Sequence, residues 1–326
     1  MKKYITKKIN NLAFNILTGL RHHPHMEKYF LLQGVSIAKQ LRNIESVEYL
    51  SDVEFSVFSQ WGEDGIIEWL IQKNGSMPEI FIEFGVEDFR ESNCRFLLMH
   101  RNWRGLVIDG SKSNIDAIQS DNISWRHDLT SRCAFITKEN INELITTSGI
   151  VGEIGILSID IDGNDFWVWE SISSISPQIV IVEYNSVFGD MLPLSIPYIG
   201  DFVRSRADQS NVYYGASIRA FSLLAKRKGY TLLGGNLAGS NAFFIRNDRL
   251  HLYEGLIKNK IVRPSRFKES RDKNNNLNFK RGAERLSAIS DKIVINIDSG
   301  EEKSISNFGE LSSKNWVAAI EGGSIV

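Results

Sequence analysis

The sequence is poor in cysteine. It has two cysteines in 326 residues. Cys94 and Cys133 are far apart and make no Cys-x-x-Cys pair, which argues against a structural zinc site and is typical of proteins from a reducing compartment. We expect both thiols to be small side chains of the core.

Strong net charge and long apolar runs are also missing. Lys and Arg total 38 against 39 for Asp and Glu, which gives a formal net charge of −1. Such a chain has no general basic field, so nucleic acid is not expected as a partner. No apolar run approaches the about 20 residues that a membrane-spanning helix needs, and the first residues lack the pattern of a signal peptide. We therefore expect a cytoplasmic protein with no transmembrane segment.

Hydrophobic residues make up 42% of the chain, which is enough to bury a sizeable core. We divide the chain into an N-terminal helical extension (1–54), an α/β domain (55–247) and a polar C-terminal extension (248–326). The first residues combine a basic start with apolar residues at helical spacing. A helix of this kind can make peripheral contact with an anionic membrane, or it can pack on the domain or on a second subunit of a homo-oligomer, and we favour packing.

The most informative stretch is ILSIDIDGNDFWVW, residues 156–169. An apolar run that leads straight into Asp160, Asp162 and Asp165 is typical of a central parallel strand, since such strands are buried on both faces. Acidic residues at its carboxyl end lie where α/β folds bind ligands. We therefore expect the chemistry of the protein at this strand end.

Strands and helices alternate five times before the chain changes character. This alternation predicts a doubly wound, mostly parallel sheet of Rossmann-like type. Residues 229–234 and 241–246, joined by a Gly/Asn-rich turn, predict an antiparallel hairpin that closes the sheet. The five expected parallel strands cover residues 80–84, 105–108, 123–126, 155–159 and 178–185.

Two other strand ends carry carboxylates. Glu83 ends its strand and Gly85 opens the turn that follows, where a backbone without Cβ allows a cofactor to approach. A dinucleotide fingerprint would need glycines where Glu87 and Arg90 stand, so the usual pyrophosphate mode is disfavoured. Asp109 fits two roles equally, an acceptor for ribose hydroxyls and an N-cap of the next helix.

The acidic stretch has three competing explanations. A calcium loop of EF-hand type fails because its glycine should come sixth. A phosphatase of haloacid-dehalogenase type, with Asp160 as nucleophile, is disfavoured because three strands precede the motif and Asn164 follows it. The third is a ligand-binding strand end shared with Glu183 and Asn185. Oxygen ligands from two neighbouring strands would suit Mg²⁺, and without a metal the carboxylates would act as base and substrate clamp, or as caps.

Taken together, the motifs resemble the FkbM-type class I S-adenosylmethionine-dependent methyltransferases, and most closely a bacterial branch associated with surface polysaccharides. The resemblance covers roughly residues 55–246. It rests on SQWGEDG (59–65), FIEFG (81–85), GLVIDG (105–110), LSIDIDGND (157–165) and VEYN (182–185), supported by YYGAS (213–217) and NAFF (241–244).

The resemblance implies an O-methyltransferase for a sugar of a surface polysaccharide or its precursor, with a glycan or small-molecule acceptor. The alternative is a non-catalytic scaffold protein of polysaccharide biosynthesis. Asp160 and Asp162 would face the reacting methyl group, with Asp162 as the base and His100 and His127 as reserve bases. Residues 86–89 depart from the usual glycine-rich loop. The S-adenosylmethionine site would comprise Gln60, Glu63, Glu83, Gly85, Asp109, Asp128 and Asp160, and a Mg²⁺ site would use Asp162, Glu183 and Asn185.

Overall fold

A seven-stranded sheet forms the centre of the molecule. The computed structural model describes residues 24–322. The strand order is β4-β3-β2-β5-β6-β9-β8; the pairs of β9 with β6 and with β8 are antiparallel, and the other pairs are parallel. The predicted α/β fold, a Rossmann-like sheet closed by a hairpin, is confirmed. The strands are β2 (Ile80–Phe84), β3 (Arg104–Asp109), β4 (Leu129–Cys133), β5 (Gly152–Ile159), β6 (Ile175–Glu183), β8 (Tyr230–Gly235) and β9 (Asn241–Arg246).

The order of the strands fixes where a ligand can bind. The chain moves outward from β2 through β3 to β4, then returns to place β5 on the other side of β2. Phe84 pairs with both Ile108 of β3 and Ile159 of β5, so these three strands end level with one another. A doubly wound sheet has its crevice at such a reversal, at the carboxyl ends of the strands.

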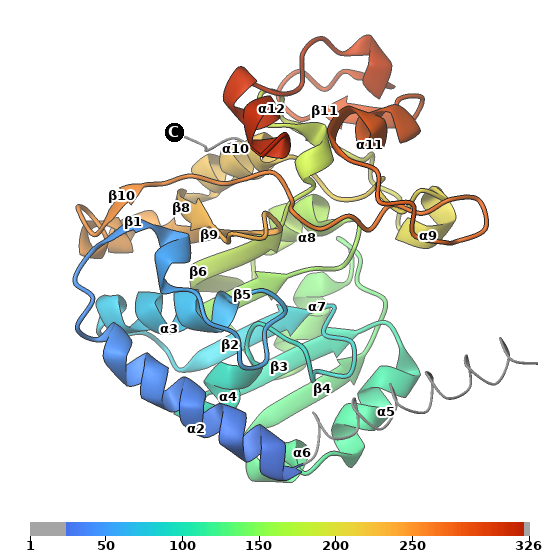
Figure 1. Cartoon of the computed structure of the whole chain (residues 1–326). Coiled ribbons are helices and arrows are strands. Elements are labelled where there is room, and N and C mark those ends of the chain that lie inside the picture. Colours follow the sequence, from blue (N-terminus) through green and yellow to red (C-terminus); the bar gives the residue numbers. More distant parts are fainter. Residues whose placement is uncertain (1–23, 323–326) are drawn as a thin grey trace, which may run out of the picture.

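Helices cover both faces of the sheet (Figure 1). Alternate residues of each strand enter opposite cores: Ile82 and Leu157 join one, while Phe81 and Ile156 join the other. This division follows from the two-residue period of a strand. The first core includes α7 (Ile141–Thr146), α8 (Asp165–Ser171) and α10 (Ile218–Lys228), and the second includes α3 (Glu63–Asn74), α4 (Arg95–Arg101) and α5 (Lys112–Ser120).

The prediction of the third strand is wrong. Residues 123–126 form the short helix α6 (Ile123–Arg126), and the strand is β4, which begins at Leu129. Asp121 accepts a hydrogen bond from the main chain of Ile123 at 2.9 Å, which favours a helix start. β4 lies at the edge of the sheet and its residues are only half-buried or exposed, so its sequence lacks an apolar run. For the same reason Cys133, expected in the core, is exposed, whereas Cys94 is buried as predicted.

The two extensions contact each other and the central domain. In the N-terminal one, α2 (Pro24–Leu41) packs on α3 and α4, and β1 (Val47–Tyr49) pairs in parallel with β10 (Ile257–Asn259). The basic segment expected to be an amphipathic helix falls in residues 1–23, outside the described residues. Among residues 24–322, no helix combines the length and apolar character needed to cross a bilayer.

The C-terminal extension builds a small sheet of its own. Its strands β11 (Ile293–Asn296) and β12 (Glu302–Ser304) join β7 (Leu194–Ser195), which belongs to the excursion between β6 and α10. The helices α11 (Gly282–Ala288) and α12 (Lys314–Ile320) lie beside this sheet, in red in Figure 1. The extension therefore packs on residues that follow the carboxyl end of β6. The remaining elements are α9 (Arg204–Ala207), η1 (Leu50–Val53), η2 (Ser186–Phe188), η3 (Asn247–Leu252) and η4 (Ile305–Asn307).

Candidate active site

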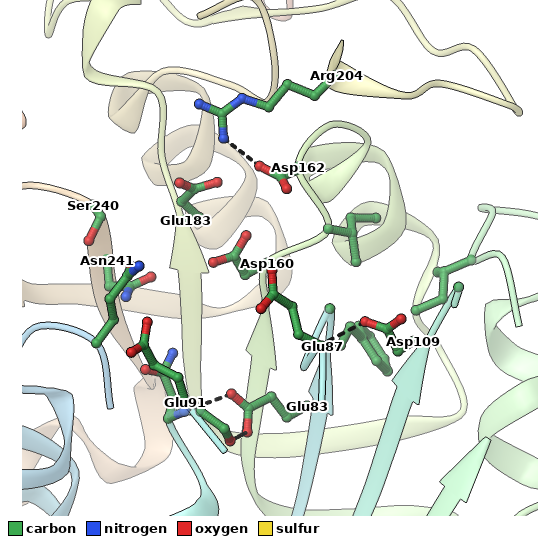
Figure 2. Close-up of a pocket in the computed structure, with 18 of the residues that line it drawn as sticks. Glu83, Glu87, Glu91, Asp109, Asp160, Asp162, Glu183, Arg204, Ser240 and Asn241 are labelled. Carbon is green, nitrogen blue, oxygen red and sulfur yellow. Dashed lines mark hydrogen bonds and ion pairs between the residues drawn. The ribbon is translucent and has the colours of Figure 1, made fainter. Parts of the chain in front are cut away.

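A pocket of about 640 Å³ opens at the carboxyl ends of the strands. Residues that follow β2, β3, β5 and β6 line it, together with Ser240 and Asn241 from the hairpin. Figure 2 shows these side chains gathered around one space. The pocket lies at the reversal between β2 and β5, where the strand order places a ligand.

The floor of the pocket is the tight turn after β2. Gly85 has φ +71°, and a Cβ added to it would lie 1.6 Å from the carbonyl oxygen of Asp160. Glycine is therefore required by both conformation and space. Glu87 and Phe89 also take positive φ, 47° and 62°, although they carry side chains. The loop thus has the backbone of a glycine-rich turn without its glycines, and Glu87 points into the pocket toward Asp160 (Figure 2).

Glu83 and Asp109 line the pocket as predicted, and protein donors already occupy much of each carboxylate. Glu83 is buried and accepts hydrogen bonds from the Ser92 hydroxyl at 2.6 Å and from two main-chain N–H groups, at Asn93 and Cys94. Burial raises the pKa of Glu83 above its usual range. These bonds fix the chain that follows the Gly85 turn.

Asp109 supports the start of α5 and lines the pocket, and its role as an acceptor for ribose hydroxyls stays a prediction. Its Oδ1 accepts a hydrogen bond from the N–H of Ser111 at 2.7 Å and from the amide of Asn114 at 3.1 Å, which secures the start of α5. Its Oδ2 accepts one from the N–H of Glu87 at 2.9 Å, which ties it to the β2 turn. Asp109 is 8% exposed and lines the pocket. The N-cap of α5 is Ser111, so the prediction of Asp109 as the cap is wrong, and its carboxylate supports the cap from one turn before the helix.

Three carboxylates converge beyond this turn. Asp160, Asp162 and Glu183 each offer an oxygen, and these three oxygens lie within 4.8 Å of one another. Burial, and then the charges of its neighbours, raise the pKa of Asp160 well above its usual range. Burial and the charge of Asp160 do the same for the pKa of Glu183. Close like charges cannot all ionise freely, so the cluster favours a shared proton or a bound cation.

Asp165, the third aspartate of the stretch, belongs to the scaffold. It is fully buried, and its two oxygens accept hydrogen bonds from the N–H groups of Ile161 and Gly163 at 2.8 and 2.9 Å. Burial raises its pKa to about 6. The turn that it closes holds Asp162 at φ +56° and directs that side chain outward, where it is 59% exposed.

Arg204, which the sequence did not single out, completes the cluster. From the one-turn helix α9 its guanidinium reaches Asp162 Oδ1 at 2.5 Å and Glu269 at 2.6 Å. It also lies over the ring of Tyr214, 3.6 Å from the ring centre. Nothing in the sequence pattern around Arg204 marks it, because its partners lie in distant segments of the chain.

The oxygens of Asp160, Asp162 and Glu183 fit a divalent cation, and this set differs from the predicted one in one residue. Glu183 is 9% exposed, and its Oε2 is a buried atom with no hydrogen-bond partner among the described residues. Three carboxylate oxygens suit a hard cation such as Mg²⁺. Asn185 is wrong as a ligand, because its amide donates to the carbonyls of Val212 and Tyr214 and accepts from the N–H of Val187. Asp160 stands in its place.

Other predicted residues lie away from the pocket. Asp128 precedes β4 at the amino edge of the sheet, where its exposed carboxylate pairs with Arg104. It was expected at the carboxyl end of a strand over residues 123–126, and because the strand begins at Leu129 the residue lies at the opposite end. His127, its neighbour, bonds with Asn102, and His100 stacks on Phe96. None of these three predicted residues is among those that line the pocket.

Gln60 and Glu63 come from the turn that leads into α3. Gln60 lines the pocket. Glu63 is buried behind the wall, where it accepts hydrogen bonds from the amides of Asn236 and Asn241 at 2.6 and 2.8 Å. Asn241 does line the pocket, so Glu63 supports a wall residue and has no direct contact with the cavity.

No protein-family model and no curated protein matches the chain. The comparison with solved structures does find similar folds. The chain is similar in structure to S-adenosylmethionine-dependent methyltransferases. One is such an enzyme from Clostridium acetobutylicum ATCC 824, at 11% identity and a TM-score of 0.35, covering 56% of this chain and 90% of that one.

Two further structures are O-methyltransferases by description. One, from Staphylococcus aureus, is described provisionally as a caffeoyl-CoA O-methyltransferase, with 14% identity, a TM-score of 0.38 and 73% of this chain and 99% of that one covered. The other is a Bacillus cereus O-methyltransferase in complex with SAH, with 13% identity, a TM-score of 0.34 and 67% and 89% covered. These similarities show the fold alone, and the strand order already establishes that fold. The FkbM-type family and the polysaccharide branch stay predictions.

Proposed function

We propose that this chain is an S-adenosylmethionine-dependent O-methyltransferase that acts on a sugar hydroxyl of a surface polysaccharide or its precursor. The observation that carries the proposal is the position and lining of the pocket. It lies at the reversal of the sheet, and it brings Gly85 and Asp109 of the expected cofactor side beside the carboxylates Asp160 and Asp162 of the expected reaction side.

The charge of the pocket suits the cofactor. Carboxylates far outnumber cationic groups in the lining, and S-adenosylmethionine carries a positive sulfonium. When bound, the cofactor supplies an electrophilic methyl group: its sulfur–carbon bond breaks as the acceptor oxygen forms an oxygen–carbon bond. The carboxylates are those of Glu83, Glu87, Glu91, Asp109, Asp160, Asp162, Glu183 and Glu269, and the cations are those of Arg204 and Lys268.

Residues of the β2 and β3 ends would hold the cofactor. Gly85 is exposed and lines the pocket, and Asp109, fixed by its bonds to the N–H groups of Glu87 and Ser111, presents a rigid wall. Gln60 also lines the pocket.

Removal of the acceptor proton is the task left to the protein. A sugar hydroxyl is a weak acid, so a base must receive its proton as the oxygen–carbon bond forms. Asp162 is the most exposed carboxylate of the cluster, and its ion pair with Arg204 fixes its orientation. We assign Asp162 as the base, with Asp160 and Glu183 behind it.

A divalent cation held by Asp160, Asp162 and Glu183 would add to this chemistry. It would neutralise the crowded negative charge and lower the pKa of a hydroxyl brought to it. The unpartnered Oε2 of Glu183 supports this assignment.

Transfer of a labelled methyl group tests the proposal. Purified protein would be incubated with methyl-labelled S-adenosylmethionine, Mg²⁺ and a panel of sugars, sugar phosphates and nucleotide sugars. Label should pass to at least one acceptor, and Asp162→Asn should reduce the rate by about 10² to 10⁴, the usual contribution of a general base. Asp116→Asn, an exposed aspartate on α5, is the matched control.

Two results would contradict the proposal. One is the absence of any methyl transfer from a protein that is folded and shows no affinity for the cofactor. The other is hydrolysis of a phosphate ester that Asp160→Asn abolishes, since that outcome identifies Asp160 as the nucleophile of a phosphatase.

A further inference from the structure

A second cavity, of about 1080 Å³, is lined almost wholly by the C-terminal extension, with Ser186 and Val187 of the central domain at its side. Residues 263–268 form one side, and the helices α11 and α12 with the loop at 309–312 form the other. The function proposed above makes no use of this cavity.

Basic side chains dominate its lining. They are Arg263, Arg266, Lys268, Lys280, Arg281 and Arg285, against the acidic Glu284, Glu310 and Glu321. Of the six basic residues, Arg285 alone has a carboxylate within ion-pair distance among residues 24–322. Part of the wall is apolar, formed by Leu286, Leu311, Val317 and Ile320. The cavity therefore combines unpaired positive charge with an apolar surface.

Arg285 shows that this charge is built into the fold. Its side chain is buried, with the residue 5% exposed, and its Nη1 donates to the Ser265 hydroxyl at 2.7 Å. Its Nε is a buried donor that finds no partner within the described residues. A buried guanidinium with a free donor is costly unless an acceptor arrives, and an oxyanion is the acceptor that matches it.

A single carboxylate serves two arginines here. Glu269 lies 3.4 Å from Arg285 Nη2 and 2.6 Å from Arg204 Nη2. Because Arg204 also pairs with Asp162, the excess of positive charge at the cavity comes from the other five basic residues, which have no ion pair among residues 24–322. The same line of charges runs through Arg204 to Asp162, and it joins the second cavity to the acidic cluster.

The two cavities share a wall. Phe267 and Lys268 line both of them, and Phe267 stacks on Trp61 at the edge of the first pocket with ring centres 5.7 Å apart. A ligand seated in the second cavity would therefore lie across Phe267 and Lys268 from the first pocket.

From these observations we infer that the second cavity binds the phosphate or diphosphate group of the acceptor, beside an apolar part of the same molecule. The inference rests on the proposed function, because it names the class of acceptor. The acidic first pocket repels a phosphate, whereas the basic cavity attracts it, so the acceptor is held with its anion on one side of the shared wall and its reacting hydroxyl on the other. A nucleotide sugar and a prenyl-linked sugar phosphate share this chemistry.

Calorimetric titration of the full chain tests the inference, with inorganic diphosphate, UDP and farnesyl diphosphate as probes and S-adenosylhomocysteine in a separate experiment. Diphosphate should bind one to one. In the double variant Lys280→Ala/Arg281→Ala its affinity should fall by about tenfold or more, as expected when charge-assisted hydrogen bonds are lost. Lys226→Ala, an exposed lysine of α10, is the matched control and should bind like the unmodified chain.

The probes distinguish the two classes of acceptor, and they distinguish failure of this inference from failure of the proposed function. Tighter binding of UDP than of diphosphate supports a nucleotide sugar, and tighter binding of farnesyl diphosphate supports a prenyl-linked one. Binding of S-adenosylhomocysteine without any phosphate probe overturns this inference and leaves the proposed function standing. If diphosphate binds the double variant as tightly as it binds the unmodified chain, the second cavity is not the binding site and the inference is overturned. Phosphate binding without S-adenosylhomocysteine binding overturns the acceptor role, because the proposed function then fails.

Discussion

Arg204 donates a hydrogen bond to Asp162 Oδ1 at 2.5 Å, and this contact joins the turn after β5 to the excursion that follows β6. The guanidinium is 11% exposed and also contacts Glu269 and Tyr214. It is the cation closest to the acidic cluster, and its charge lowers the pKa of Asp160 and of Glu183 against the larger effect of burial. The arginine thus offsets part of the cost of grouping three carboxylates.

Replacing this arginine by glutamine should destabilise the protein. Arg204→Gln leaves the cluster without its paired cation and Glu269 with Arg285 alone, and we expect a loss of about 2 kcal/mol in the free energy of unfolding, discounted for the exposure of Asp162. Urea denaturation at neutral pH measures it. Arg206→Gln, on the same turn of helix, loses only a bond to the carbonyl of Asp201 and should cost much less. Equal losses in the two variants would contradict this role for Arg204.

Gly85 offers a test of the β2 turn. Gly85→Ala must overcome both a positive φ and the contact with the Asp160 carbonyl, so we expect a loss of about 3 kcal/mol or more in unfolding free energy. Gly75→Ala is the matched control, because φ is +77° there and nothing lies within 4 Å. It should lose about 1 to 2 kcal/mol, the cost of the backbone conformation alone. A similar loss at both sites, measured by urea denaturation, would show that the turn can move.

Glu87 should lower both the stability of the turn after β2 and the affinity of the pocket for S-adenosylhomocysteine. It holds φ 47° in the turn, and burial together with the charges of Asp88 and Asp109 raises its pKa. Glu87→Gly removes the strain and a charge that lies beside other carboxylates, so we expect a gain of about 1 kcal/mol in stability and tighter binding of S-adenosylhomocysteine. Glu87→Ala removes the charge but keeps the strain and should fall between the two. A Glu87→Gly variant less stable than the unmodified protein would show that the carboxylate makes a favourable contact.

The acidic cluster predicts a link between pH, stability and divalent cations. Asp160 and Glu183 have pKa values well above their usual 3.8 and 4.5 in the folded chain, so the native state binds more protons than the unfolded state above that range. Without a cation, the contribution of these groups to the unfolding free energy therefore falls as pH rises above about 4.5. Added Mg²⁺ should reverse part of this fall, with a larger effect at pH 8 than at pH 6, because cations and protons compete.

Thermal denaturation at several pH values, with and without Mg²⁺, measures the effect. In Glu183→Gln the response to Mg²⁺ should be lost, whereas Glu170→Gln, an exposed glutamate paired with Arg227, should keep it. A response that survives in Glu183→Gln would place the cation elsewhere.

Much of the fold could be predicted because the signal is local. β2, β3, β5 and β6 are apolar runs that end in or beside carboxylates, and parallel strands bring their carboxyl ends together. That rule alone was sufficient to place Glu83, Asp109 and Asp160 in one pocket. It failed at β4, since an edge strand needs no continuous apolar run, and Asp128 was misplaced with it.

The rest of the site depends on contacts that no local pattern encodes. Arg204 lies on a helix of one turn, and its link to Asp162 spans 42 residues of the chain. Asn185 has the right residue type at the right strand end, but its amide turns toward Val212 and Tyr214 and is fully engaged there. Residue type and strand position predict proximity, whereas side-chain direction is decided by the packing around it.

Binding of S-adenosylhomocysteine is the measurement that tests the central claim most directly. Calorimetric titration of the folded chain should give one-to-one binding. Asp109→Ala should weaken it by about tenfold or more through loss of a charge-assisted contact, whereas Asp128→Ala, at the opposite edge of the sheet, should bind like the unmodified protein. No detectable heat from the folded protein, or equal affinity in Asp109→Ala and the unmodified chain, would contradict a cofactor site at the carboxyl edge of β2 and β3.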